Sequence, residues 1–424
     1  MPSPVPILRR CLCGVLIALF AGVLLAPSIQ KIVRFPKEKP LIGVRFRTTD
    51  FPPWTPASWI RGEFSAAADE WIREHAGLRG WGVYLNRQLR YLLFGQLASA
   101  PLHNRSLVVG RENYLFERLY LSEALRQPVI SPEKMDDFGF RLARMQRILR
   151  EQGMAFLVIL APNKTLLYSD KLPAWAQRQV ADEHSDFPAF LAALQRHGVN
   201  HLDTMALFRR LRPEIPDLVA PHSSHWSYRG AWVAWQHAIP LINQQGLLPE
   251  LPVPQPEDFF IRDPIDMDDE LRVQLNLFFA SHGRPAPATY PIVDPPPAGT
   301  EPVLDALVIG DSYSFGLTDA MARSHLCRHM HQWFYLRTAY EIAPASFDSR
   351  RQRLLSHRNK LGIYRSTDES GRLFFPGKNL VILVLTTFNI DKYSWGLDRL
   401  VNRLYGNPAD NPVFEPEIEV NLED

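Results

Sequence analysis

Residues 304–314 read LDALVIGDSYS, in which a short apolar run ends directly in Gly310, Asp311 and Ser312. Continuous apolar runs of this length are typical of strands buried inside a parallel sheet. Gly310 permits a tight turn, and Ser312 would then open the next helix, where backbone N–H groups have no helical partner. Ligand sites in open α/β sheets lie just beyond the carboxyl ends of strands, so the turn predicts a site at the edge of a sheet.

Strand and helix patterns alternate on both sides of this turn. Further strands are predicted at 106–116 (strand, turn, strand), 155–160, 199–202 and 380–385. Helices are predicted at 64–75, 83–93, 131–152, 187–196 and 228–239. This alternation indicates the α/β class, with a sheet of mainly parallel strands flanked by helices and with long proline-rich loops.

Composition restricts the function classes. The 424 residues are 46% hydrophobic and 22% charged, as in a globular chain with a core. The net charge is +2 and no basic stripe occurs, so a nucleic acid is not an expected partner. The three cysteines have no metal-ligand spacing and no phosphate-cradling glycine loop is present, so neither a metal nor another cofactor is predicted.

The N-terminus carries an apolar run from residue 11 to residue 27, preceded by Arg9 and Arg10. These arginines favour a cytoplasmic N-terminus with the rest of the chain sent across a membrane. A cleaved signal peptide is the alternative, since Ala21, Gly22 and Ala26 are small residues near the end of the run. The predicted organisation is therefore an anchor or signal peptide at 1–30, an extended tether at 31–60 and the α/β domain at 61–424.

Ser312 is the candidate nucleophile at this site. A serine nucleophile needs a base, and His225 is the best candidate. It lies in PHSSHWSYRG (221–230), a polar segment just before the helix predicted at 228–239. His222 ranks second as base. A purely structural interpretation is also open, in which Asp311 and Ser312 cap one helix and Ser227 caps the other.

Six short blocks, in this order along the chain, resemble the SGNH-like sugar O-acetyltransferases of the bacterial periplasm, best known from alginate acetylation (the AlgJ/AlgX kind). The blocks are WIREHAGLR (71–79), RYLLFG (90–95), VVGRENYLF (108–116), LAPNK (160–164), HWSYRG (225–230) and GDSYS (310–314). Six blocks in order are far more specific than any single one, and they extend over most of the chain after the tether.

The resemblance implies a Ser-His-Asp triad with Ser312 as nucleophile and His225 as base. The family's aspartate should lie two residues before the histidine, where this chain has Ser223. Three interpretations stay open. The site works as a Ser-His dyad with Ser223 holding the imidazole, or Asp203 (less well Asp311) supplies the acid, or the site is degenerate and the protein binds or scaffolds polysaccharide.

The resemblance also implies the reaction and its setting. A membrane-bound O-acyltransferase would donate acetyl, which Ser312 would pass to a hydroxyl of an exported polysaccharide. An acetyl esterase of the same fold is the rival activity. The protein is then expected in the periplasm, held in the inner membrane by residues 11–27. Residues expected at the substrate are Asn163, Trp226, Tyr313 and Arg229. The structural alternatives are a turn residue for Asn163, core packing for the two aromatic side chains and a surface salt bridge for Arg229.

Overall fold

A computed structural model of the chain describes residues 5–42, 50–94, 107–125, 128–180, 185–256, 258–264, 266–279, 288–292, 301–343, 346–348, 353–355, 358–364 and 367–407. Contacts divide the chain into two compact units. The first comprises Met1–Ser106 with Arg272–Ser281, and the second comprises Leu107–Leu271 with His282–Asp424. The division at residues 30 and 60 stays a prediction. Within the first unit, the helices between residues 56 and 94 pack with one another and with residues 274–279.

The first unit is helical. Its helices are α1 (Val5–Val33), α2 (Pro56–Ile60), α3 (Glu63–His75) and α4 (Arg79–Phe94). Within α1, the 22 residues Leu12–Val33 are long and apolar enough to cross a membrane. This confirms one apolar helix at the N-terminus. The predicted extended tether is shorter than expected, since α1 continues to Val33 and residues 56–60 form α2, which Thr55 caps.

The second unit is built on a seven-stranded sheet with the strand order β12-β9-β8-β7-β13-β3-β4. The five strands from β8 to β4 are parallel, and β9 and β12 add an antiparallel edge. The strands are β3 (Ala155–Ala161), β4 (His201–Asp203), β7 (Leu304–Gly310), β8 (Cys327–Phe334), β9 (Thr338–Ile342), β12 (Arg358–Ile363) and β13 (Leu380–Thr386). Every residue of β3, β7 and β13 is buried, as expected of strands covered on both faces.

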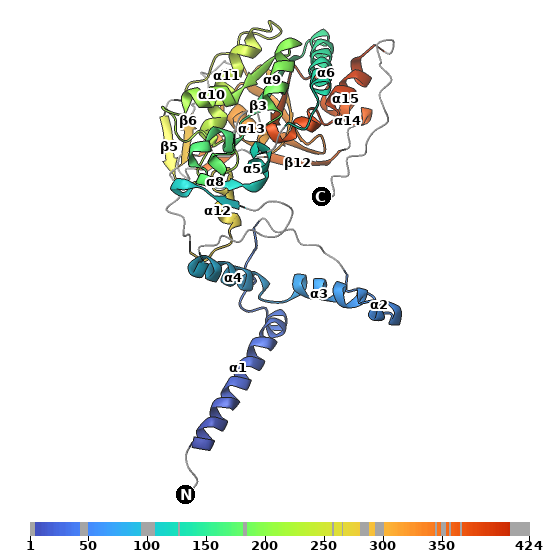
Figure 1. Cartoon of the computed structure of the whole chain (residues 1–424). Coiled ribbons are helices and arrows are strands. Elements are labelled where there is room, and N and C mark those ends of the chain that lie inside the picture. The colour runs from blue at the N-terminus through green and yellow to red at the C-terminus, as the bar shows by residue number, and fades with distance from the viewer. Residues whose placement is uncertain are drawn as a thin grey trace. The chain divides into compact units, whose positions relative to one another are not determined.

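Helices flank this sheet (Figure 1). One group is α6 (Pro132–Glu151), α9 (Phe187–Arg196), α14 (Asp368–Phe374) and α15 (Leu397–Tyr405), in which α6 packs on α9 and α15. In the other group, α11 (Tyr228–Asn243) packs on α13 (Ser314–Arg323). The α/β architecture with a mostly parallel sheet is thus confirmed.

Shorter elements complete the second unit. They are β1 (Leu107–Val109), β2 (Leu115–Glu117), α5 (Arg118–Leu125), α7 (Lys164–Leu167), α8 (Ala174–Gln177), α10 (Thr204–Leu211), β5 (Asp258–Arg262), β6 (Ala288–Ile292), β10 (Ser346–Asp348) and β11 (Arg353–Leu355). Helix α12 (Glu270–Gln274) carries the chain from the second unit to the first. The strand predicted at 199–202 begins two residues later, at His201.

Candidate active site

The turn that follows β7 holds Ser312. Gly310 is required there, because a Cβ atom at this position would lie 2.6 Å from the carbonyl oxygen of Val384 in β13. Asp311 is buried and fixes the turn from its side chain: it accepts hydrogen bonds from Tyr313 N (3.1 Å), Thr386 N (2.8 Å) and the Asn389 amide (3.0 Å). Ser312 therefore stands, half-buried, at the carboxyl edge of the parallel sheet just before α13.

His225 lies in the segment that precedes α11. Ser227 caps α11 by accepting a hydrogen bond from Gly230 N, and Trp226 forms a β-bridge with Val219. The Lys164 ammonium fixes the other side of the segment. It donates to the carbonyl oxygens of Leu115, Ala220, Pro221 and Ser223, at distances of 2.6–2.9 Å.

Three side chains from distant parts of the chain form a hydrogen-bonded row. His225 Nε2 lies 2.7 Å from Ser312 Oγ, and His225 Nδ1 lies 2.6 Å from Glu270 Oε1. Glu270 is the first residue of α12, and Leu271 N donates to the His222 carbonyl oxygen at 2.9 Å, which ties the start of α12 to the histidine segment. A carboxylate at Nδ1 accepts the Nδ1–H and leaves Nε2 free to take the serine proton.

Burial and the neighbouring charges shift the pKa values of His225 and Glu270. Burial lowers the pKa of His225, but the charge and hydrogen bond of Glu270 more than reverse this effect, so the pKa lies above its usual value. Burial raises the pKa of Glu270, but His225 and two hydrogen bonds from Ser224 bring it down to about 2. Glu270 is therefore ionised at neutral pH, and its charge would stabilise an imidazolium at His225.

Ser223, predicted to hold the imidazole, supports the acid and the backbone instead. Its hydroxyl accepts a hydrogen bond from His225 N (3.0 Å) and lies 3.3 Å from Glu270 Oε1. Ser224 also donates to Glu270 Oε1, from its N–H (2.9 Å) and its hydroxyl (2.7 Å). The expectation that Ser223 bonds the ring is wrong, because Glu270 already fills Nδ1.

The alternative acids lie elsewhere. Asp203 caps α10 and accepts a hydrogen bond from Ala206 N at 3.0 Å, so it is not the partner of the imidazole. The Asp311 oxygens are engaged with the serine turn and with residues that follow β13. His222, the second candidate base, is buried with its Nδ1 3.7 Å from Asp269.

Three of the four residues expected at the substrate are buried. Trp226 and Tyr313 have no exposed surface, and the Tyr313 hydroxyl lies 2.5 Å from the Ser224 carbonyl oxygen. Asn163 is also fully buried, caps α7 and donates to Glu123 at 2.8 Å. These side chains offer no face to a sugar, because they are covered by the packing that holds the Ser312 turn against the His225 segment.

Arg229 is partly exposed in the first turn of α11, where it pairs with Asp217 (3.1 Å) and lies over the Phe259 ring (4.8 Å). Its contact with an acidic polysaccharide stays a prediction.

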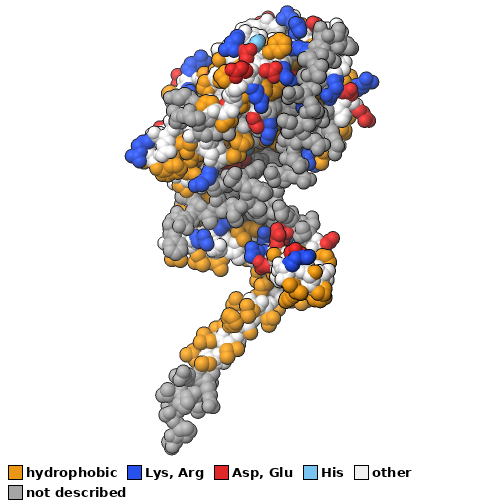
Figure 2. Space-filling view, turned by 45° about the vertical axis from the view of Figure 1, so that its right-hand side comes forward, with side chains coloured by type: hydrophobic (Ala, Val, Ile, Leu, Met, Phe, Trp, Pro, Cys, Tyr) orange, Lys and Arg blue, Asp and Glu red, His pale blue; other side chains and the backbone are white. Residues whose placement is uncertain are grey.

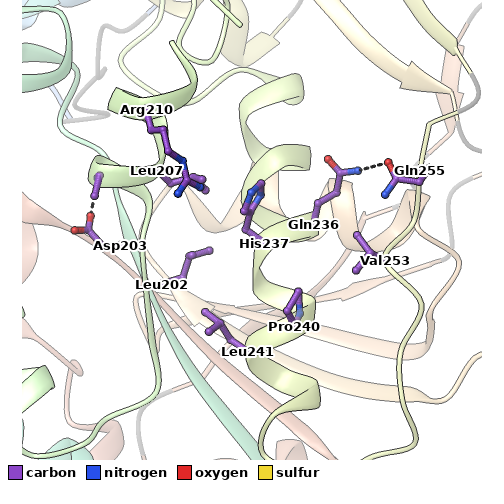
Figure 3. Close-up of a pocket in the computed structure, with 11 residues that line it drawn as sticks. Leu202, Asp203, Leu207, Arg210, Gln236, His237, Pro240, Leu241, Val253 and Gln255 are labelled. Atoms are coloured by element: carbon purple, nitrogen blue, oxygen red, sulfur yellow. Dashed lines mark hydrogen bonds between the residues drawn. The ribbon is translucent and has the colours of Figure 1, made fainter. Parts of the chain in front are cut away.

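A separate pocket of about 680 Å³ lies between α10 and α11 at the β4 edge of the sheet (Figure 3). Asp203, Arg210 and His237 are among the residues that line it, and Ser312, His225 and Glu270 are not.

Sequence reasoning missed Glu270. It lies in the acidic run DMDDE (266–270), 45 residues after His225, in a segment without a strong helical or strand pattern. Acidic side chains before a short helix read as solvated cap residues, and only the fold distinguishes Glu270 from its neighbours. Among the residues that the structure describes, no group of three or more histidine, cysteine or acidic side chains is arranged to hold a metal ion.

The family model of an SGNH hydrolase-like domain, described as acetyltransferase AlgX, matches residues 107–317. Solved structures with a similar fold include the O-acetyltransferase domain of Pseudomonas putida AlgJ, at 16% identity over 70% of this chain and 99% of that one, with a TM-score of 0.42. Pseudomonas aeruginosa AlgX is 13% identical over 73% and 69% of the two chains, with a TM-score of 0.43. Bacillus cereus PatB1, solved with a sulfonyl adduct, is 15% identical over 69% and 99%, with a TM-score of 0.44.

No curated protein sequence matches the chain. The family match extends from β1 into α13 and so includes His225, Glu270 and Ser312. Together with the mostly parallel sheet flanked by helices, it identifies the second unit as an SGNH hydrolase-like domain of the AlgX/AlgJ acetyltransferase family.

Proposed function

We propose that this protein is a serine-dependent O-acetyltransferase that moves acetyl through Ser312 to hydroxyl groups of an exported polysaccharide. The observation that carries the proposal is the row Ser312–His225–Glu270, with 2.7 Å and 2.6 Å between the hydrogen-bonding atoms. A hydroxyl, an imidazole and an ionised carboxylate in this order are the groups that an acyl-serine mechanism requires.

In the first half-reaction, His225 Nε2 takes the proton of Ser312 as Oγ bonds to the acetyl carbonyl carbon. The imidazolium, stabilised by Glu270, then gives this proton to the departing group as its bond to the acetyl carbon breaks. The backbone N–H of Ser312, at the entrance to α13, is a candidate donor to the oxyanion. Acetyl-Ser312 results.

In the second half-reaction, a sugar hydroxyl attacks acetyl-Ser312 and passes its proton to His225. The ester bond to Oγ breaks, His225 returns the proton to Oγ, and the acetylated sugar leaves. Water as the acceptor would give an acetyl esterase by the same steps, so acceptor choice depends on how far water is excluded from the acetyl-enzyme.

The proposed setting is supported by the family match and by the apolar helix α1. We propose that α1 anchors the protein in the inner membrane with the acetyltransferase domain in the periplasm. A membrane-bound O-acyltransferase would then deliver acetyl at the same membrane. The acceptor would be an exopolysaccharide of the alginate kind.

The decisive experiment incubates the purified protein with a chromogenic acetyl ester, with and without an oligosaccharide, and follows acetyl on Ser312 and on the sugar by mass spectrometry. The expected result is an acetyl-enzyme that discharges onto sugar. Ser312→Ala should form no acetyl-enzyme, whereas Ser324→Ala, a buried serine outside the row, should form it normally.

Acetyl released only to water would establish an esterase instead. A Ser312→Ala strain that acetylates its polysaccharide as well as the wild type would leave the protein a binding or scaffolding role.

A further inference from the structure

In helix α4 of the first unit, polar side chains are buried and apolar side chains are exposed. Its buried face consists of Tyr84, Arg87 and Gln88, and its exposed face carries leucines at helical spacing. Leu85, Leu89, Leu92 and Leu93 are 54%, 47%, 66% and 69% exposed. A surface helix in water turns apolar side chains inward and polar ones outward, so the free face of α4 is built for a different environment.

The chain itself covers the polar face. Arg87 Nη1 donates to the carbonyl oxygens of Gln274 and Leu275, both at 3.0 Å, and the Gln88 side chain accepts from Phe279 N at 3.1 Å. The Tyr84 ring packs against the Phe278 ring with their centroids 5.3 Å apart. These contacts fix the rotation of α4 about its axis, and the leucines point away from the segment 274–279.

The start of α4 is fixed beside the end of α1. Gly77 is so close to α1 that a Cβ atom there would lie 2.2 Å from the Pro27 carbonyl oxygen. Trp81 donates from its indole N–H to the Lys37 carbonyl oxygen at 3.0 Å, and the Lys39 ammonium lies over the Trp81 ring. The apolar span of α1 ends at Val33. The first leucine of the face, Leu85, comes one helical turn after Trp81, which contacts the segment that directly follows that span.

Figure 2 shows hydrophobic side chains exposed along α1 and on the helices of the same unit. We propose that α4 lies in the headgroup region of the bilayer that α1 enters, with Leu85, Leu89, Leu92 and Leu93 inserted between the upper acyl chains. A tryptophan at one end and Arg90 beside the leucine face are the residues that membrane interfaces favour. The inference depends on a retained α1 and not on the acetyltransferase proposal.

Lipid is favoured over a protein partner as the occupant of the leucine face, because α1 already enters a bilayer close to the start of α4. The last turn of α1 and the segment directly after it carry Lys31, Arg34, Lys37 and Lys39, whose charges suit anionic headgroups. Wherever α1 is embedded, lipid is already present at the level of its end. A protein partner would need a complementary surface at the same depth.

The test uses the full chain reconstituted into vesicles of phosphatidylethanolamine and phosphatidylglycerol. Cys11, Cys13 and Cys327 are replaced by serine or alanine, and a single cysteine carrying an environment-sensitive fluorophore is placed at Leu85, Leu89 or Leu92. Arg90, exposed beside the leucine face, is the matched control position. Quenchers are lipids with a doxyl group either near the headgroup or near the end of the acyl chain.

The expected result is quenching at Leu85, Leu89 and Leu92 several-fold stronger than at Arg90, and stronger for the shallow quencher than for the deep one. Equal quenching at all positions would overturn the proposal. So would a blue shift that grows with protein concentration but is insensitive to doxyl lipids, because the face would then bind a second copy of the chain. The same leucine-to-cysteine variants should retain wild-type hydrolysis of an acetyl ester in detergent, which shows that the second unit is intact.

Discussion

At His225 the carboxylate comes from Glu270, although the family motif places it two residues before the histidine. Because Glu270 fixes the tautomer and stabilises the imidazolium, Glu270→Gln should lower kcat for acetyl-ester turnover by about 10³- to 10⁴-fold with a small change in KM. Asp203→Asn, which removes the acid expected from the sequence, should retain near-wild-type kcat. Steady-state kinetics on the purified variants decide this, and a Glu270→Gln enzyme within threefold of wild type would exclude the role.

A second substitution at the motif position can restore the missing charge. The Ser223 hydroxyl lies 3.3 Å from Glu270 Oε1, so an aspartate there brings a carboxylate close to His225. The double variant Ser223→Asp, Glu270→Gln should turn over at least about tenfold faster than Glu270→Gln alone, since an oriented carboxylate supplies the lost imidazolium stabilisation. Ser223→Asn in the same background is the neutral control. Equal rates for the two double variants would contradict the prediction.

The pH profile tests the charge coupling directly. His225 acts as base only when neutral, and Glu270 holds its pKa above the usual value of about 6.5. Wild-type kcat/KM should therefore fall as pH drops through a value above about 6.5. Without the carboxylate, burial dominates and lowers the pKa of His225, so the residual activity of Glu270→Gln should fall at a lower pH. A shift in the opposite direction would show that another group controls the acid limb.

At the scale of elements, α7 and the histidine segment are joined by one side chain. The Lys164 ammonium donates to four carbonyl oxygens, and burial lowers its pKa well below the usual value. An uncharged amine would turn a lone pair toward one of these oxygens, so the geometry requires the charged form. Lys164 thus links the LAPNK block to the segment that holds His225, without itself touching Ser312.

Lys164→Met removes the ammonium donor from these four buried carbonyl groups, of which the Ala220 and Pro221 oxygens keep a backbone N–H donor. The variant should lower the free energy of unfolding by about 3 kcal/mol. Because the His225 segment loosens, kcat should fall more than stability alone explains at temperatures where the variant is folded. Lys171→Met is the control, since Lys171 forms a more exposed pair with Glu112. Denaturant unfolding and acetyl-enzyme formation measure the two effects, and a variant as stable and active as the control would contradict this account.

At the scale of the whole molecule, retention of α1 decides where the protein works. The end of α1 takes part in the folded first unit: Gln30 is buried and donates to the Pro36 carbonyl oxygen at 3.0 Å, and Gly77 packs on Pro27. The mature protein should therefore keep residues 1–33 and stay with membranes after carbonate extraction. A chain with residues 1–33 deleted should be released, and an N-terminus found near Ala26 in cells would establish a cleaved signal peptide instead.

The sequence predicts the apolar strands and the Gly310–Ser312 motif that follows one of them. The runs within 155–161, 304–310 and 380–386 predict a parallel sheet because strands covered on both faces need apolar side chains at every position. Gly310 and the serine that follows it then fall at the strand end, where a site is expected. His225 was found by its motif, and the structure brings it within 2.7 Å of Ser312.

Only the tertiary structure identifies the acid beside His225 and shows what the neighbouring residues do. Glu270 belongs to no local sequence pattern. It lies beside His225 because Leu271 N donates a hydrogen bond to the His222 carbonyl oxygen and because Ser223 and Ser224 donate to the Glu270 carboxylate. Trp226 and Tyr313 have the chemistry of sugar-binding side chains, yet packing around the His225 segment and the Ser312 turn buries them. Sequence patterns report which side chains must be covered, whereas the direction in which a polar group points depends on contacts between segments far apart in the chain.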